Sequence, residues 1–322
     1  MDSHQRFIET MHYGTPDRVP YFEEGIRSDV YRVWREQGLT DDIEKSGLLK
    51  SDELDEIDLD LDMTSMIGRL RFSTGLSKSR YNPVNVALQH IRRKRISAIL
   101  KRCKGVRFLR VHRGFFLNMG VYDWTRFSEV ITALSDDPRS VYRHMMGRGE
   151  TIAGFIKKLL SKVDIEAAIF NEPIGGNDGP LMSPRMYESY VLTSYDPIID
   201  VLKKSGVETI IFRTYANSRV LIPAALKHGF NCLWACETNA AAMDYVDLRR
   251  EFGRDLRLVG GIDLDALRKG RRAIAAEIDK VSTLLSDGGY IPIVDGRVRK
   301  DIRLENYLFY RKQLKGLITS KA

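Results

Sequence analysis

Charged or amide side chains stand at the ends of seven short apolar runs, and segments with helical spacing of apolar residues separate these runs. This alternation predicts parallel strands joined by helices. In a parallel barrel the carboxyl ends of the strands meet on one face, where catalysis and binding take place. The residues that we expect on that face are Glu23, Glu24, His112, Arg113, Asn171, Glu172, Arg213, Glu237, Asp263 and Asp295.

Three of these acids are candidates for catalysis. Glu172 precedes a loop with three glycines, which allows the backbone to approach a ligand closely. Glu172 or Glu237 could act as a general acid if burial raises its pKa. Asp295 ends the last run and is followed by the loop "GRVRKD" rather than by a helix. Asp263 is interpreted equally well as a site residue or as a helix N-cap, because it precedes "LDALRKG".

The cations at the run ends have alternatives that the sequence leaves open. Arg213 ends an otherwise apolar run, where a charge requires an acid or an anionic ligand as partner. A structural ion pair with Glu172 or Glu237 is as good an interpretation as a substrate carboxylate. His112 could contact substrate or be a satisfied structural histidine.

The cysteines do not indicate a metal site. Cys103, Cys232 and Cys236 are too few for a disulfide framework, and an odd number fits a reducing compartment. Cys232 and Cys236 lie in a strand-like run, where cysteine is usually a small buried apolar residue. Ligand pairs of standard zinc spacing are absent from the sequence. We therefore expect no metal and no tightly bound cofactor.

These elements predict a (β/α)₈ TIM barrel with an N-terminal helical extension, formed as one domain over residues 1–322. An eighth strand is expected between residues 59 and 86, for instance at residues 66–73, and long helices near residues 135–163 and 183–206. The expected strands are residues 18–24, 106–113, 166–172, 208–214, 231–237, 256–263 and 289–295. A doubly wound sheet is the less economical alternative, because the chain has no glycine-rich phosphate-binding turn.

The charge balance favours acidic ligands. The 322 residues include 51 Lys and Arg against 43 Asp and Glu, a net charge of +8. The basic stretch 91–105 and the acidic stretch 51–62 are best interpreted as two solvated helices, so we expect no nucleic-acid partner. The N-terminus lacks the apolar core of a signal peptide, and no apolar run approaches the ~18 residues of a membrane span. A cytoplasmic protein is expected.

Four motifs in order resemble the uroporphyrinogen decarboxylase superfamily, in its branch of decarboxylase-like proteins and corrinoid-linked methyltransferases. They are "RFIETMHYGTPDRVPYFEE", "NDGPLMSPRMYESYVL", "RLVGGIDLDALRKGRRAIAAEI" and "GGYIPIVDGRVRKDIRLENYLFY". The resemblance extends from about residue 6 to residue 314. It implies a barrel whose funnel opens at the strand carboxyl ends, and homodimers are common in this superfamily.

The chain departs from the superfamily pattern at several positions. Arg27 stands where the decarboxylases carry an arginine-rich motif, and Arg213 and Tyr215 stand where the methyltransferases carry zinc ligands. Gly296 follows Asp295 in place of a histidine, and the next residues are basic. Guanidinium groups bind carboxylate or phosphate in a bidentate manner, so the pocket is interpreted as a site for an anion. The candidates for substrate binding are Arg27, His112, Asn171, Arg213, Tyr215, Asp263 and Arg297.

The resemblance implies a methyltransferase of the O-demethylase type, which passes a methyl group from a small anionic substrate to a corrinoid (cobalamin) protein. The first alternative is a carboxy-lyase that acts on a polycarboxylate such as a tetrapyrrole, with arginines holding the carboxylates. The second is a divergent, non-catalytic ligand-binding barrel.

Overall fold

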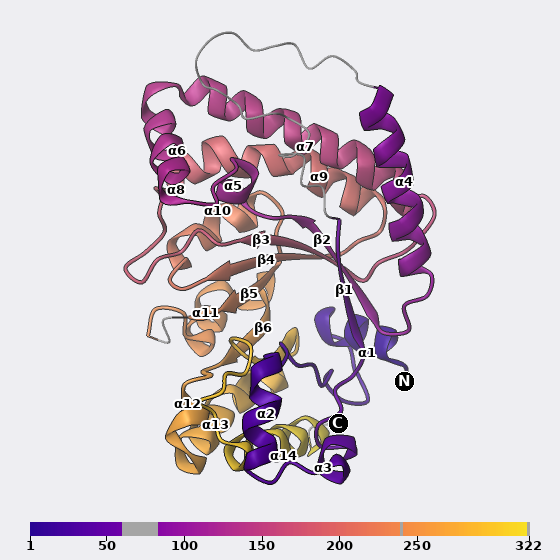
Figure 1. The fold of residues 1–322 in the computed structure, drawn as a ribbon, viewed down its shortest axis with the longest axis vertical. Helices are drawn as coiled ribbons and strands as arrows, with labels where there is room; N and C mark the ends of the chain where they lie inside the picture. The colour runs from indigo at the N-terminus through magenta and orange to yellow at the C-terminus, as the bar shows by residue number, and fades with distance from the viewer. Residues whose placement is uncertain (60–82, 239–240, 321–322) are drawn as a thin grey trace.

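The computed structural model describes residues 1–59, 83–238 and 241–320, and Figure 1 shows its fold. Within these residues, seven strands form a single sheet in the order β1 to β7, and each strand pairs in parallel with the next. The strands are β1 (Leu54–Asp58), β2 (Val106–His112), β3 (Ala167–Glu172), β4 (Thr209–Tyr215), β5 (Cys232–Cys236), β6 (Arg257–Ile262) and β7 (Tyr290–Val294).

The sheet is curled like part of a TIM barrel. The rings of Phe108 in β2 and Trp234 in β5 lie 6.3 Å apart between centroids, although two strands separate β2 from β5. Strands β5 and β7 are buried along their whole length, as expected when both faces of a parallel sheet are covered. The expected α/β architecture is therefore confirmed as a curled seven-stranded half-barrel.

Helices connect successive strands and cover the outside of the sheet. Figure 1 shows α7 and α9 side by side over the sheet, with α12, α13 and α14 gathered at the opposite end of the molecule. The helices are α1 (Ser3–Met11), α2 (Ser28–Glu36), α3 (Asp41–Lys45), α4 (Pro83–Leu100), α5 (Phe115–Asn118), α6 (Trp124–Asp136), α7 (Pro138–Leu160), α8 (Pro184–Tyr187), the π-helix η1 (Glu188–Leu192), α9 (Thr193–Lys204), the 3₁₀-helix η2 (Arg219–Leu221), α10 (Ile222–Lys227), α11 (Tyr245–Phe252), the 3₁₀-helix η3 (Gly253–Asp255), α12 (Ala266–Lys269), α13 (Arg271–Asp287) and α14 (Leu304–Ser320).

The long helices begin where the sequence indicates. Asp137 accepts a hydrogen bond from the backbone N–H of Ser140 at the start of α7, and Pro138 occupies the first turn. Ser183 caps α8 in the same way, ahead of Pro184. None of the described helices is both long enough and apolar enough to cross a membrane.

Two predictions about the N-terminal third are wrong. Residues 18–24 are extended but form no ladder with the described strands, because Pro20 has no N–H and the N–H of Tyr21 donates instead to the Asp52 side chain at 2.8 Å. The acidic stretch 51–62, interpreted as a solvated helix, contains strand β1. The eighth strand expected near residues 66–73 lies outside the described residues.

The extended N-terminal segment nevertheless lies between the two ends of the sheet. The N–H of Asp52, just before β1, donates to the carbonyl of Tyr21 at 2.9 Å. Ile26 forms an isolated parallel bridge with Val298, in the loop after β7. This placement brings Glu24 and Arg27 to the edge of the sheet where the strands end.

Candidate active site

Arg213, near the end of β4, is the centre of a buried ion-pair cluster. Its guanidinium donates to Glu24 Oε1 and, at 2.9 Å, to Glu56 Oε2. The same group lies over the Trp234 ring, 4.3 Å from the ring centroid. Only 8% of the Arg213 side chain is exposed, so the two carboxylates supply the counter-charges that burial demands.

From the sequence alone, Arg213 could pair with Glu172 or Glu237, or it could bind a substrate carboxylate. The structure gives Arg213 two internal partners, and neither is Glu172 or Glu237. Glu24 comes from the extended N-terminal segment and Glu56 from β1. We call the group of Glu24, Glu56 and Arg213 the strand-end triad.

Glu24 has the properties of a proton donor. Burial raises the pKa of its carboxyl to about 7, helped by the charges of Glu56 and Glu23 and opposed by Arg213. Its Oε2 atom is buried and has no hydrogen-bond partner among the described residues. A proton on Oε2 would therefore have no acceptor among the described residues.

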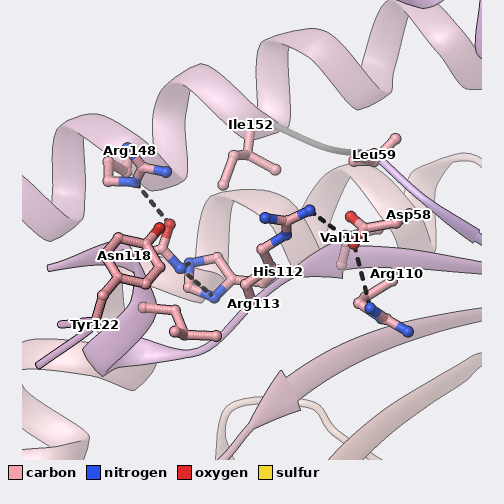
Figure 2. Close-up of a pocket in the computed structure, with 11 residues that line it drawn as sticks. Asp58, Leu59, Arg110, Val111, His112, Arg113, Asn118, Tyr122, Arg148 and Ile152 are labelled. Carbon is pink, nitrogen blue, oxygen red and sulfur yellow. Dashed lines mark hydrogen bonds and ion pairs between the residues drawn. The ribbon is translucent and has the colours of Figure 1, made fainter. Parts of the chain in front are cut away.

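A second set of ion pairs extends from the triad toward β2. Glu56 also accepts from Arg110, and Arg110 lies 3.2 Å from Asp58. Arg113 approaches the same Asp58 carboxylate at 3.0 Å. Figure 2 shows Arg110 and Arg113 converging on Asp58 beside a cavity of about 20 Å³, which has room for about one water molecule. This cavity is therefore too small to hold a substrate.

His112 lines the cavity from the end of β2 but is held by its surroundings. Its Nδ1 accepts the N–H of Gly114 at 3.0 Å, and the Asn118 amide lies 3.2 Å from the ring nitrogens (Figure 2). Burial, together with the charge of Arg148, lowers the pKa of His112 to about 3. This imidazole stays neutral near pH 7, and its observed contacts stabilise the loop that leads into α5.

Glu172, at the end of β3, joins three segments of the chain. Its carboxylate accepts from Tyr195 Oη at 2.5 Å, Tyr187 Oη at 3.2 Å and the N–H of Phe115 at 2.8 Å. Burial raises its pKa to about 7. A Cβ on Gly114 would come within 2.8 Å of the Glu172 carboxylate, so this glycine allows the close approach.

The π-helix η1 explains how two tyrosines reach one carboxylate. Tyr187 and Tyr195 are eight positions apart, which in a regular α-helix would separate them by about 80° around the axis. The wider turn of η1 takes up about one additional residue, so the two side chains return to nearly the same face.

Glu172 should make the protein less stable as the pH rises. Its pKa is about 7 in the folded chain against 4.5 ordinarily, so its contribution is complete below about pH 4.5 and is lost as the pH rises through 7. The free energy of unfolding should fall by about 1.4 kcal/mol per pH unit within this window for this group. Glu172→Gln should remove that share of the slope, which urea denaturation at pH values from about 5 to 8 would measure. An unchanged slope would contradict the assignment.

Asp295, directly after β7, organises the loops that follow β5 and β6. It accepts from Thr238 N at 2.9 Å, Thr238 Oγ1 at 2.7 Å and Leu264 N at 3.0 Å. Burial raises its pKa, and these hydrogen bonds oppose the rise. An acid at the end of this buried strand therefore fixes two neighbouring loops at the working face.

The rim of this face is more exposed and carries several arginines. Glu237 Oε1 lies 3.3 Å from Arg299 and 3.9 Å from Arg27. Arg297 is exposed and, among the described residues, has no ion-pair or hydrogen-bond partner. We call Arg27, Arg297 and Arg299 the rim arginines.

The remaining candidates make local contacts. Tyr215 Oη donates to Asn171 Oδ1 at 3.3 Å, which links the ends of β3 and β4. Asp263 accepts the N–H of Asp265 at 2.8 Å and so closes the turn before α12, whose N-cap position is occupied by Asp265.

The described part of the chain contains no metal-ligand cluster, and the thiols of Cys232 and Cys236 are not readily ionised. There, no three His, Cys, Asp or Glu side chains lie close enough together to hold a metal ion. Cys232 and Cys236 are buried in β5, and burial raises the pKa of each thiol to about 12.

A larger groove, of about 390 Å³, lies between α11 and α13 at the opposite edge of the sheet. Arg249 and Arg254 line it and donate to backbone carbonyls, including those of Gly288 and Asp287. These arginines satisfy the carbonyls at the ends of the two helices.

Sequence reasoning missed the acids that matter most to Arg213. Glu24 appeared only as one of several run-end residues, and Glu56 and Asp58 were assigned to a solvated helix. A weak signal was available: "LDEIDL" places Ile57 and Leu59 two residues apart on either side of an acid, a spacing that favours a strand.

Comparison with known proteins identifies a shared fold. No protein-family model and no curated protein sequence matches the chain. Among solved structures, a methyltransferase from Methanosarcina mazei superposes with a TM-score of 0.60 and 11% sequence identity, over 98% of this chain and 99% of that one. At this identity the likeness shows the fold, over nearly the full length of both chains.

Proposed function

We propose that this chain is a methyltransferase that removes a methyl group from a small methylated anion and passes it to a corrinoid protein. The main support is Glu24, a carboxyl with a pKa of about 7 and a buried oxygen without a partner among the described residues, at the carboxyl end of the sheet. The full-length similarity in fold to a methyltransferase agrees with this proposal.

The chemistry requires a proton at the leaving oxygen. In transfer from a methoxy compound, the reduced corrinoid supplies the electron pair of the new bond to the methyl carbon. The carbon–oxygen bond breaks, its electron pair remains on oxygen, and that oxygen takes the proton from Glu24 Oε2. Arg213, which also pairs with Glu56, holds Glu24 in place, and the charge of Glu56 helps to keep Glu24 protonated near pH 7.

The other acids have different roles in this proposal. Glu172 and Asp295 are buried and fully hydrogen-bonded to loops and tyrosines, so they act as positioning residues. The rim arginines supply positive charge for the anionic group of the substrate. Glu237 belongs to this rim and not to the reacting centre.

The test is to mix the protein with cob(I)alamin and methoxylated benzoates and to record the absorbance of methylcobalamin. Formation that depends on the protein supports the proposal, and its absence with every substrate contradicts it. Incubation with uroporphyrinogen, followed by chromatography of the porphyrins, tests the decarboxylase alternative, which predicts stepwise loss of carboxylates.

A further inference from the structure

Glu237 adopts a backbone conformation that is unusual for its type. Its φ is +45°, in the left-handed region that favours glycine, asparagine or aspartate. The neighbouring contacts hold it there: its N–H donates to the carbonyl of Asp295 at 2.5 Å, and Thr238 is tied to the Asp295 carboxylate. Strain of this kind persists where the surrounding structure fixes it, often at ligand sites.

The strained turn presents the Glu237 carboxylate to cations from two distant segments. Arg299 follows β7 and Arg27 follows the extended N-terminal segment, at 3.3 and 3.9 Å. Arg297 lies on the same loop, where its Nε stands 3.6 Å from the position that a Cβ on Gly25 would occupy. One carboxylate therefore faces an excess of guanidinium groups.

The rim arginines have donors left over. Arg299 Nε is buried and has no hydrogen-bond partner among the described residues, and Arg297 makes no ion pair there. A buried guanidinium donor without an acceptor is unfavourable, and a second oxyanion would satisfy it. Half of the Glu237 side chain is exposed, so its own ion pairs are weak and replaceable.

We propose that Glu237 is an internal stand-in for the carboxylate of the substrate. It occupies the place between Arg27 and Arg299 in the free protein, and a carboxylate on the ligand displaces it and binds to the rim arginines. This inference rests on the proposed function and specifies its substrate class: a small methylated carboxylic acid.

Gly296 allows the displacement. A Cβ at this position would lie 3.5 Å from Glu237 Cγ, in van der Waals contact with the side chain that has to move. With glycine there, Glu237 is not packed on that side and can swing away. The glycine after Asp295 thus leaves space for Glu237 to move when the ligand enters.

The test uses benzoate, which carries the carboxylate but no methyl group, and isothermal titration calorimetry without a methyl acceptor. Glu237→Gln should bind benzoate about three to five times more tightly than wild type, because the internal competitor is gone. Arg297→Gln should bind it about tenfold more weakly, because one charged donor is lost. Neutral benzamide should bind equally to wild type and Glu237→Gln.

A matched control is available in α14. Glu305 is 52% exposed and lies 3.2 Å from Arg303, which closely parallels the 50% exposure of Glu237 and its 3.3 Å distance from Arg299. Glu305→Gln makes the same change in net charge, and it should leave benzoate affinity unchanged. Glu237→Asn provides a second variant that suits the left-handed backbone, and it should also tighten binding.

Three results would overturn the proposal: no benzoate binding to any variant, weaker binding after Glu237→Gln and Glu237→Asn, or equal tightening by Glu305→Gln. The test is separate from methyl transfer. If benzoate behaves as expected but no methoxybenzoate yields methylcobalamin, the carboxylate subsite stands and the proposed reaction fails.

Discussion

Replacing Glu24 with glutamine should lower the rate of methyl transfer by about 10²- to 10⁴-fold, the usual contribution of a positioned general acid. The amide oxygen can still accept the hydrogen bond from Arg213, so the fold of the strand-end triad should survive. What is lost is the proton on Oε2. The effect should fall on kcat, measured as methylcobalamin formed per second at saturating substrate, with KM nearly unchanged.

Glu56 provides the comparison, because it pairs with the same arginine. Its charge raises the pKa of Glu24, so Glu56→Gln should lower that pKa and move the loss of activity to lower pH. A smaller fall in kcat near pH 7 is expected than for Glu24→Gln. If the two variants lose activity equally and show the same pH profile, Glu24 has no special role.

Replacing Arg213 with methionine should reduce the free energy of unfolding by about 3–5 kcal/mol near pH 8, the usual effect of removing one partner of a buried ion pair. Glu24 would then lose its cation, and Glu56 would keep only its ion pair with Arg110. Urea denaturation followed by circular dichroism measures the loss.

The pH dependence of this loss distinguishes charge from packing. Glu24 takes up a proton as the pH falls through about 7, and without Arg213 its pKa rises further, so the deficit should shrink near pH 5.5. The double variant Arg213→Met with Glu24→Gln should recover part of the stability at pH 8. A deficit of the same size at both pH values would indicate lost packing against Trp234 instead.

The sequence was informative about the sheet from β2 onward. Six apolar runs became strands because each is short, flanked by helices and buried in a parallel sheet. The N-terminal part was harder to predict. Residues 18–24 have the composition of a strand, but Pro20 and the Asp52 side chain prevent the ladder. Strand β1 was missed because its acids resemble a solvated surface until Arg110 and Arg213 are placed beside them.

The roles of individual acids depend on tertiary contacts that spacing does not encode. Asp295 and Glu172 could be placed at the working face from their positions after strands. Their partners, Thr238 and the two tyrosines, come from other loops and helices. The pairing of Arg213 with residues 24 and 56 joins three distant segments, so only the folded chain reveals which carboxyl has a free oxygen.

The most direct test of the account is the pH dependence of kcat/KM for methyl transfer from a methoxybenzoate to cob(I)alamin, in wild type and in Glu24→Gln. If protonated Glu24 donates the proton, wild-type activity should be constant below about pH 7 and fall tenfold per pH unit above it, while the variant should be slow and lack this transition. A wild-type profile without a decline near pH 7, or the same decline in the variant, would contradict the assignment of Glu24 as the general acid.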